Sequence, residues 1–528
     1  MKHKILLVLI VFLAFFLRVY RISEIPPALY WDEASIGYNA YSIATTLHDE
    51  HGNFLPVSNF PAFGDYKAPG YIYAAAASIK IFGLSEFSIR LPSVLAGTLL
   101  VLVTFFLVKE LLTNPATGLL ASLFVAVSPW SLQLSRGAFE SNLATLFSAS
   151  GIYFFLHAVR SKSTIRYLLA AICFVASMYS FNSHRVFVPL LIGTLSLIFH
   201  RELILSWKKS LPFYLLSFIL LLPLIPHLLS PEGKLRFNEV SWVNDTVIVE
   251  NANKLIADHG NSIFSKIIYN RRVLYGQEFL KHYLDHFRFD FLFLSGDINP
   301  RLSTRSVGLF YLIDLIPLLF GALFLLRQKS KTSLVLISWL VLGIVPAAVA
   351  KETPHALRIL TTMPVPQILT AVGLVWLVQK QKWLPLIVIF GYVFYLIGCL
   401  YNYYSSYPNE LSSSWQYGYK QAVEYTKTVE NKYDHVSVTN FLGRPYIYFL
   451  LYNQYPPEKF WQNRDASKDR FGFWTVSSFD KFVFDSSGNG KGRWLYIRAP
   501  SDTPINAKIL YTIRDSTGAP VFNFYDNL

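Results

Sequence analysis

Two polar motifs, Trp31-Asp32-Glu33 and Gly64-Asp65-Tyr66-Lys67-Ala68-Pro69, lie in one stretch of the chain, residues 26–69. The first motif follows an apolar segment, and the second leads into another. Two adjacent carboxylates and a lysine near the ends of apolar segments indicate a polar site at a membrane surface. The alternative is an ordinary solvated loop, so the interpretation depends on the rest of the chain.

The composition is that of a membrane protein. Of 528 residues, 53% are hydrophobic and only 15% are charged, which is too apolar for a soluble globular protein. The net charge of +14 comes from short basic clusters between apolar runs, so no nucleic-acid-binding patch is expected. Cys173 and Cys399 both lie inside apolar runs, which predicts no disulfide outside the membrane.

The apolar runs recur along the chain, and a helix that spans a bilayer needs about 20 mostly apolar residues. Every second connection is short and basic, as at residues 160–162 and 327–331, which places those connections in the cytoplasm. The sequence therefore predicts an α-helical polytopic membrane protein with about eleven transmembrane helices and a cytoplasmic N-terminus. The predicted spans are residues 5–20, 88–108, 116–134, 143–159, 167–181, 186–199, 211–229, 307–326, 333–350, 359–378 and 383–401.

Two domains are predicted: a transmembrane domain over residues 1–401 and a small extracytoplasmic α/β domain over residues 402–528. The outer loops of the first are residues 21–87, with two interfacial helices at 34–46 and 70–82, and residues 230–306, which should be folded and partly helical. The α/β assignment depends on a helix expected at 415–430 and on strand-like runs at 435–439, 482–484, 494–497, 508–513 and 521–525.

Asp32 and Glu33 are the candidate catalytic residues. Two adjacent carboxylates need a cation, a metal or a proton nearby, because like charges a few ångströms apart oppose each other's ionisation. Asp32 fits a general base that takes a proton from an attacking hydroxyl or amine. The alternative is that Asp32 or Glu33 caps the helix expected from residue 34.

Several cations lie on the predicted outer side. Lys67 stands where it could meet a lipid phosphate, although a lysine at a span end also extends toward water without a ligand. Arg185 and Arg358, with His355 close by, need anionic partners, which are either a donor phosphate or structural salt bridges to Glu140 or Glu352.

Taken together, these residues resemble the bacterial membrane glycosyltransferases of the protein-mannosyltransferase and aminoarabinose-transferase type, which have the GT-C fold. The resemblance covers about the first 200 residues well and the remainder by topology. Its motifs are Asp32-Glu33 after the first span, Lys67-Ala68-Pro69, residues 82–93, residues 136–140 after the third span, and His355-Ala356-Leu357-Arg358 before the tenth.

The resemblance implies a polyprenyl-phosphate sugar donor, and transfer with inversion at the outer face of the cytoplasmic membrane to a lipid, a cell-envelope glycan or a protein. It places the family's acidic pair on Asp32 and Glu33, and the lysine near the donor phosphate on Lys67. Here Ala68 separates that lysine from Pro69, where relatives often have Lys-Pro directly. The family's second-loop acid falls on Glu140, which with Arg136 would orient the sugar or acceptor.

A divalent metal is one open question, since Asp32, Glu33 and Glu140 offer oxygen ligands suited to Mg²⁺ or Mn²⁺. Another is the class of protein. A lipid or glycan transporter would also place ionisable residues near its spans, and Asp314 and a few prolines within spans are hints of one. A non-catalytic assembly or receptor protein would not need an acid pair backed by cations. The clustering of polar residues at one membrane face favours chemistry there.

Overall fold

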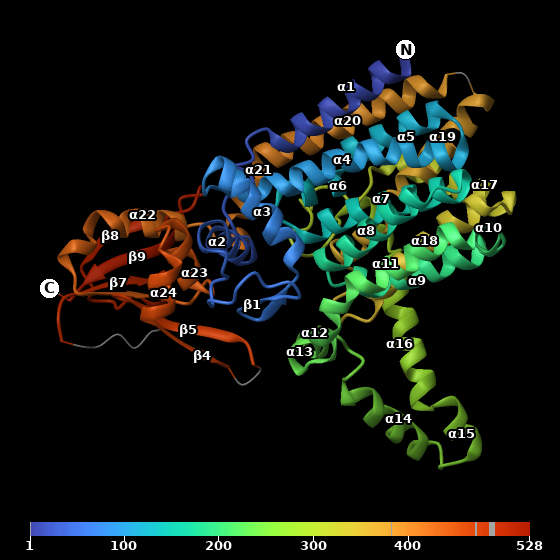
Figure 1. Ribbon diagram of the computed structural model, residues 1–528. Coiled ribbons are helices and arrows are strands. Elements are labelled where there is room, and N and C mark those ends of the chain that lie inside the picture. The colour runs from blue at the N-terminus through green and yellow to red at the C-terminus, as the bar shows by residue number, and fades with distance from the viewer. Residues whose placement is uncertain (1, 382, 470–471, 485–490, 528) are drawn as a thin grey trace. The chain divides into compact units, whose positions relative to one another are not determined.

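A computed structural model describes residues 2–381, 383–469, 472–484 and 491–527, and most of them are helical (Figure 1). The helices, in chain order, are α1 (Lys2–Val19), α2 (Trp31–Thr46), α3 (Pro69–Phe82), α4 (Glu86–Leu112), α5 (Pro115–Val127), α6 (Pro129–Arg136), α7 (Glu140–Ser161), α8 (Thr164–Ser180), α9 (His184–Ile198), α10 (His200–Leu205), α11 (Trp207–Leu221), α12 (Ile225–Leu229), α13 (Pro231–Val240), α14 (Thr246–Asp258), α15 (Ile263–Ile268), α16 (Arg271–Asp285), α17 (Leu315–Gln328), α18 (Lys331–Ala348), α19 (Val365–Lys380), α20 (Leu384–Tyr404), α21 (Ser406–Glu410), α22 (Tyr419–Val429), α23 (Pro445–Tyr452) and α24 (Pro457–Asn463). The strands are β1 (Phe60–Ala62), β2 (Asp65–Lys67), β3 (His435–Val438), β4 (Arg464–Lys468), β5 (Trp474–Phe479), β6 (Phe482–Val483), β7 (Trp494–Arg498), β8 (Ile509–Arg514) and β9 (Pro520–Asp526).

The predicted class, a multi-pass membrane protein, is confirmed. Among the described residues, five helices are long and apolar enough to cross a bilayer, or six if the bent pair α5 and α6 forms one span. Three shorter apolar helices, α8, α9 and α19, correspond to further predicted spans. The count of eleven stays a prediction, because several apolar helices are shorter than a bilayer needs.

Asp314 lies at the start of a helix and not in the middle of a span. Helix α17 begins at Leu315, although the sequence predicted a span over residues 307–326. The carboxylate of Asp314 accepts a hydrogen bond from the main-chain N–H of Tyr311 at 2.9 Å. The acid therefore satisfies an N–H group at the helix start, which is a structural reason for its position.

The chain divides by its internal contacts into two compact units. Unit 1 contains residues 1–14, 97–132 and 141–396, and unit 2 contains residues 15–96, 133–140 and 397–528. Unit 2 thus combines the segment predicted as the first outer loop, a short segment around the start of α7 and the C-terminal part of the chain. The predicted division at residue 401 into transmembrane and extracytoplasmic domains stays a prediction.

The C-terminal part of unit 2 is built on a seven-stranded sheet with the order β4-β5-β6-β3-β7-β9-β8. Strand β3 pairs in parallel with β6 and β7, and the other neighbours are antiparallel. Aromatic contacts hold helices on this sheet, for example Tyr425 of α22 against Phe524 and Phe449 of α23 against Phe482. The predicted α/β character is confirmed, with two additional strands, β4 and β5.

The segment predicted as the first outer loop, residues 21–87, contains both predicted short helices and a small hairpin. Strand β1 pairs antiparallel with β2, with Phe60 opposite Lys67. Pro69 occupies the first position of α3, where its missing N–H is not needed, and a proline also favours extended backbone before it. Lys67 is therefore held in a strand immediately before a helix. The placement of α2 and α3 at a membrane interface stays a prediction.

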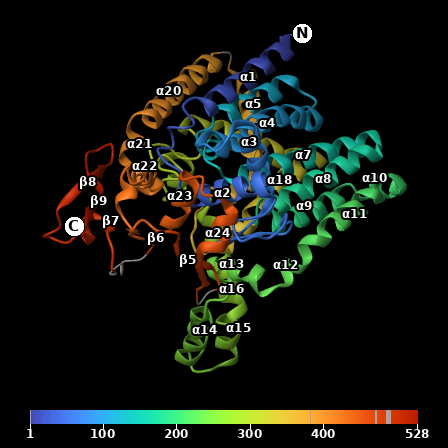
Figure 2. The same cartoon turned by 60° about the vertical axis from the view of Figure 1, so that its left-hand side comes forward.

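The long loop of unit 1, predicted over residues 230–306, is folded and largely helical. It contains α13, α14, α15 and α16, and α14 and α15 lie at the far end of α16 in both views (Figures 1 and 2). Trp242, which precedes α14, donates its indole N–H to the carbonyl oxygen of Ala348 at 2.9 Å and so ties the loop to α18.

Candidate functional site

Asp32 and Lys67 form the centre of a polar site within unit 2. Asp32 lies in the first turn of α2 and Lys67 ends β2, and the Lys67 Nζ atom is 2.6 Å from Asp32 Oδ1. The Lys67 side chain is only 2% exposed, whereas the Asp32 side chain is 33% exposed. A buried ammonium thus holds a carboxylate that stays partly exposed to solvent.

The charge on Lys67 is stabilised by its neighbours. Burial alone would lower the pKa of Lys67, but the carboxylates of Asp32, Glu140 and Asp65 outweigh burial, and the pKa is raised. The Asp65 Oδ2 atom lies 3.9 Å from Nζ. Lys67 is therefore an ammonium ion surrounded by acids, and the structure brings it together with Glu140 as well as Asp32.

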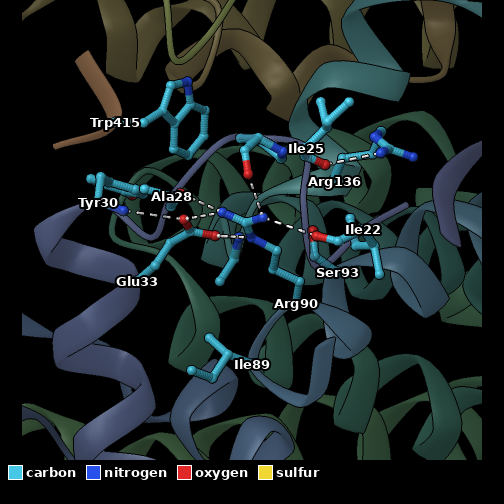
Figure 3. A network of polar contacts seen from close by, with 12 residues as sticks. Ile22, Ile25, Ala28, Tyr30, Glu33, Ile89, Arg90, Ser93, Arg136 and Trp415 are labelled. Atoms are coloured by element: carbon cyan, nitrogen blue, oxygen red, sulfur yellow. Dashed lines mark hydrogen bonds and ion pairs between the residues drawn. The ribbon is translucent and has the colours of Figure 1, made fainter. Parts of the chain in front are cut away.

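Glu33 points away from this pair and binds Arg90 of α4. The two side chains are fully buried, with Nε to Oε1 and Nη2 to Oε2 distances of 3.0 Å each (Figure 3). The carboxylate also accepts hydrogen bonds from the main-chain N–H groups of Ala138 at 2.7 Å and Tyr30 at 3.4 Å. Through these contacts Glu33 positions the first turn of α2 against Arg90 and Ala138. The catalytic role of Glu33 stays a prediction.

The helix-capping alternative for the acid pair is partly wrong. Helix α2 begins at Trp31, three residues before the predicted start, so the residue before the helix is Tyr30 and neither acid occupies that position. Glu33 does satisfy the N–H of Tyr30 from inside the first turn. Asp32 directs its carboxylate to Lys67 instead, because neighbouring residues on a helix point in different directions.

Arg90 and Arg136 use all five of their N–H groups on acceptors of unit 2. Besides Glu33, Arg90 donates to the carbonyl oxygens of Ile22, Pro26 and Ala28. Arg136 donates to the Tyr403 hydroxyl and to the carbonyl oxygens of Leu17, Arg18, Tyr20 and Ile25. The two guanidinium groups therefore fix residues 17–28, which lead directly to Asp32, as Figure 3 shows for the part around Arg90. The role of Arg136 in orienting a sugar stays a prediction.

Arg90 supports the site, and no role was predicted for it from the sequence. It belongs to the resembling stretch of residues 82–93 and lies inside a predicted span, at residues 88–108. A buried arginine requires a counter-ion and acceptors for all its N–H groups. That requirement was the available signal, and the counter-ion is Glu33, which the sequence had offered as a catalytic acid.

The remaining predicted residues belong to unit 1. Arg185, at the start of α9, donates from Nε to the carbonyl oxygen of Met178 at 3.2 Å. Arg358 begins a short 3₁₀ helix, Arg358–Thr362, and donates from Nη1 to the main-chain oxygen of Glu352 at 3.4 Å. His355 precedes that short helix and lies outside it. The donor-phosphate roles of these three residues stay predictions.

No group of three or more His, Cys, Asp and Glu side chains is gathered to hold a metal ion in the described part of the chain. The acids near Asp32 instead share the ammonium of Lys67.

Comparisons with known proteins agree with this architecture. Residues 66–229 match the family model described as dolichyl-phosphate-mannose-protein mannosyltransferase. The crystal structure of ArnT from Cupriavidus metallidurans in the apo state aligns with a TM-score of 0.58 over 99% of this chain and 98% of that chain. The chain has the GT-C fold. Sequence identity to ArnT is 10%, so that alignment shows the fold alone.

Two further structures share this GT-C fold. ArnT from the same organism bound to undecaprenyl phosphate aligns with a TM-score of 0.57 and 10% identity over 99% of this chain and 98% of that chain. The archaeal oligosaccharyltransferase AglB from Archaeoglobus fulgidus, in complex with an inhibitory peptide and a dolichol-phosphate, aligns with a TM-score of 0.50 and 12% identity over 85% of this chain. This chain spans 63% of the length of that protein. No curated protein sequence matches the chain.

Proposed function

We propose that this membrane protein is a glycosyltransferase that moves a sugar from a polyprenyl-phosphate donor to an acceptor lipid, cell-envelope glycan or protein. The observation that carries the proposal is the contact between Asp32 and Lys67, an accessible carboxylate held by a buried ammonium. The family-model match over residues 66–229 and the GT-C fold support the same class of enzyme. Polyprenyl phosphates, which appear with ArnT and AglB, are the proposed donor class here.

The reaction assigns a separate task to each residue of the pair. Asp32 accepts the proton of the acceptor hydroxyl or amine while that atom forms a bond to the anomeric carbon of the sugar. The bond from the anomeric carbon to the phosphate oxygen breaks, and the phosphate keeps the electron pair. Lys67 stabilises the negative charge that develops on this oxygen, and attack from the opposite face inverts the anomeric configuration.

The proposed setting is the outer face of the cytoplasmic membrane, with the N-terminus in the cytoplasm and residues 402–528 outside. Basic short connections on alternate sides of the apolar runs support this orientation. A polyprenyl donor keeps its tail in the bilayer and its phosphate at the surface, so a site beside apolar helices suits it. In this proposal Glu140, which acts electrostatically on Lys67, orients the sugar.

The test is sugar transfer from radiolabelled polyprenyl-phosphate donors by the purified protein. Asp32→Asn keeps the size of the side chain and removes the base, so we expect transfer to fall at least 100-fold. Glu24→Gln is the matched control, because Glu24 is an exposed acid of the same unit that pairs with Arg21. Full activity of Asp32→Asn at equal folded yield would remove the base assignment. If the wild type transferred sugar from none of the donors, the alternative that the protein is a lipid or glycan transporter would be favoured.

A further inference from the structure

Arg444 lies against the hairpin that carries Lys67. It immediately precedes α23, and its guanidinium carbon is 5.4 Å from the centre of the Phe63 ring. A side-chain carbon placed on Gly64 would be 3.7 Å from Arg444 Nη2. Phe63 and Gly64 form the two-residue loop between β1 and β2, and β2 ends at Lys67. The guanidinium is therefore beside the turn that precedes the ammonium.

The same segment of chain also contacts the residue before Asp32. A side-chain carbon on Gly443 would lie 2.6 Å from the ring of Trp31, so the backbone passes directly against that indole. Gln416 joins the two segments, because its Oε1 accepts from the N–H of Trp31 at 2.8 Å and its Nε2 donates to the carbonyl oxygen of Leu442 at 2.9 Å. Residues 442–444 are thus fixed next to both halves of the candidate site.

The balance of charge near Lys67 is negative and favours a further cation. Three carboxylates, those of Asp32, Asp65 and Glu140, act on this one ammonium. Arg90 and Arg136 contribute no free N–H group, because each donates five hydrogen bonds to protein acceptors. A phosphate that approached this site would meet an excess of negative charge unless a further cation accompanied it.

Arg444 has the donors that this situation requires. Within the ranges that the structure describes, its guanidinium makes no hydrogen bond and no ion pair, and the residue is only half-buried. Its backbone is left-handed, with a φ of 48°, a region that non-glycine residues adopt rarely. Stacking on Phe63 restricts the planar group and leaves its N–H edge available.

We propose that Arg444 binds the phosphate of the lipid-linked donor together with Lys67. This inference rests on the proposed glycosyltransferase function and adds a donor-binding residue from the C-terminal part of the chain. Guanidinium groups suit phosphate because two parallel N–H donors can reach two oxygens. The contact forms with the donor and persists as the phosphate leaves.

The experiment measures binding of undecaprenyl phosphate to the purified full-length protein without turnover. The variants are Arg444→Ala, Arg444→Lys and Arg514→Ala, the last a control at an exposed arginine on the edge strand β8. We expect about tenfold weaker binding for Arg444→Ala, a smaller loss for Arg444→Lys, and wild-type binding for Arg514→Ala. Undecaprenol, which has no phosphate, should bind the wild type and Arg444→Ala equally.

Other outcomes separate this inference from the proposed function. Unchanged binding of undecaprenyl phosphate to Arg444→Ala, with or without a lower melting temperature, would overturn the inference. The role of Arg444 would then be limited to its structural contact with Phe63. Equal weakening for undecaprenol and its phosphate would also overturn it, because the loss would not concern the phosphate. A wild type that binds no undecaprenyl phosphate would overturn both this inference and the proposed donor class.

Discussion

Glu33 and Arg90 form a fully buried ion pair through two hydrogen bonds of 3.0 Å, and this pair joins the start of α2 to α4. The guanidinium also holds the carbonyl oxygens that lead into α2. Asp32, the residue before Glu33 on α2, therefore depends on the pair for its position. A defect at either partner should first appear as a loss of stability.

Removal of one partner should leave the other charge buried without a counter-ion. Glu33→Gln or Arg90→Met should each lower the free energy of unfolding of unit 2 by about 3–5 kcal/mol. The double variant should lose less than the sum of the two single variants, because neither charge remains. Thermal unfolding in detergent measures all three. Additive losses would show that the two side chains do not act as a pair.

Arg136→Lys should destabilise the protein although the charge is retained. A lysine has three N–H donors on one atom and cannot reach the hydroxyl of Tyr403 and four carbonyl oxygens together. We expect a loss of about 2–4 kcal/mol from the carbonyl groups left without donors. Arg21→Lys is the control, because Arg21 is an exposed residue paired with Glu24, and its change should be within about 0.5 kcal/mol. Equal melting temperatures for both variants would contradict the clamp.

The sequence predicted the class of the fold and the central pair of the site for physical reasons. Apolar runs of sufficient length have few alternatives to a membrane helix, and charges beside them need partners. Asp32 and Lys67 were selected on that ground, and the structure brings them together at 2.6 Å. Strands such as β7 and β9 were recognised because alternating and aromatic residues mark them.

The roles of neighbouring residues were not accessible in the same way. The start of α2 was placed three residues too late, and without the helix start the different directions of Asp32 and Glu33 could not be derived. The protein acceptors of Arg136 could not be predicted, because main-chain carbonyl acceptors leave no trace in a sequence. Strand β4, Arg464–Lys468, was missed because it is a polar edge strand whose pairing with β5 depends on tertiary contacts.

Lys67→Ala should reduce sugar transfer about 100- to 1,000-fold, because it removes the cation proposed to stabilise the leaving phosphate. The raised pKa of Lys67 keeps the ammonium charged at every pH of a practical assay. Deprotonation of Lys67 should therefore cause no fall in the transfer rate up to about pH 10. The stabilisation from its carboxylate partners is present below its ordinary pKa of 10.5 and is lost only as the pH rises through the higher folded-state pKa. Lys508→Ala, at an exposed lysine, is the control. Unchanged transfer by Lys67→Ala would contradict the role.

Glu50 should make the stability of unit 2 depend on pH. Burial, with a smaller effect from Asp49, raises the pKa of Glu50 from 4.5 to about 8, against the opposing attraction of Arg464. The favourable neutral form is complete below pH 4.5, and stability is lost as the pH rises toward 8, at up to about 1.4 kcal/mol per pH unit. Glu50→Gln imitates the neutral acid and cannot ionise. Its melting temperature should therefore match the wild type near pH 4.5 and exceed it by a growing margin up to pH 8, while the exposed control Glu24→Gln shows no such divergence. Parallel melting curves of Glu50→Gln and the wild type across this range would show that Glu50 is ionised in the folded protein without cost.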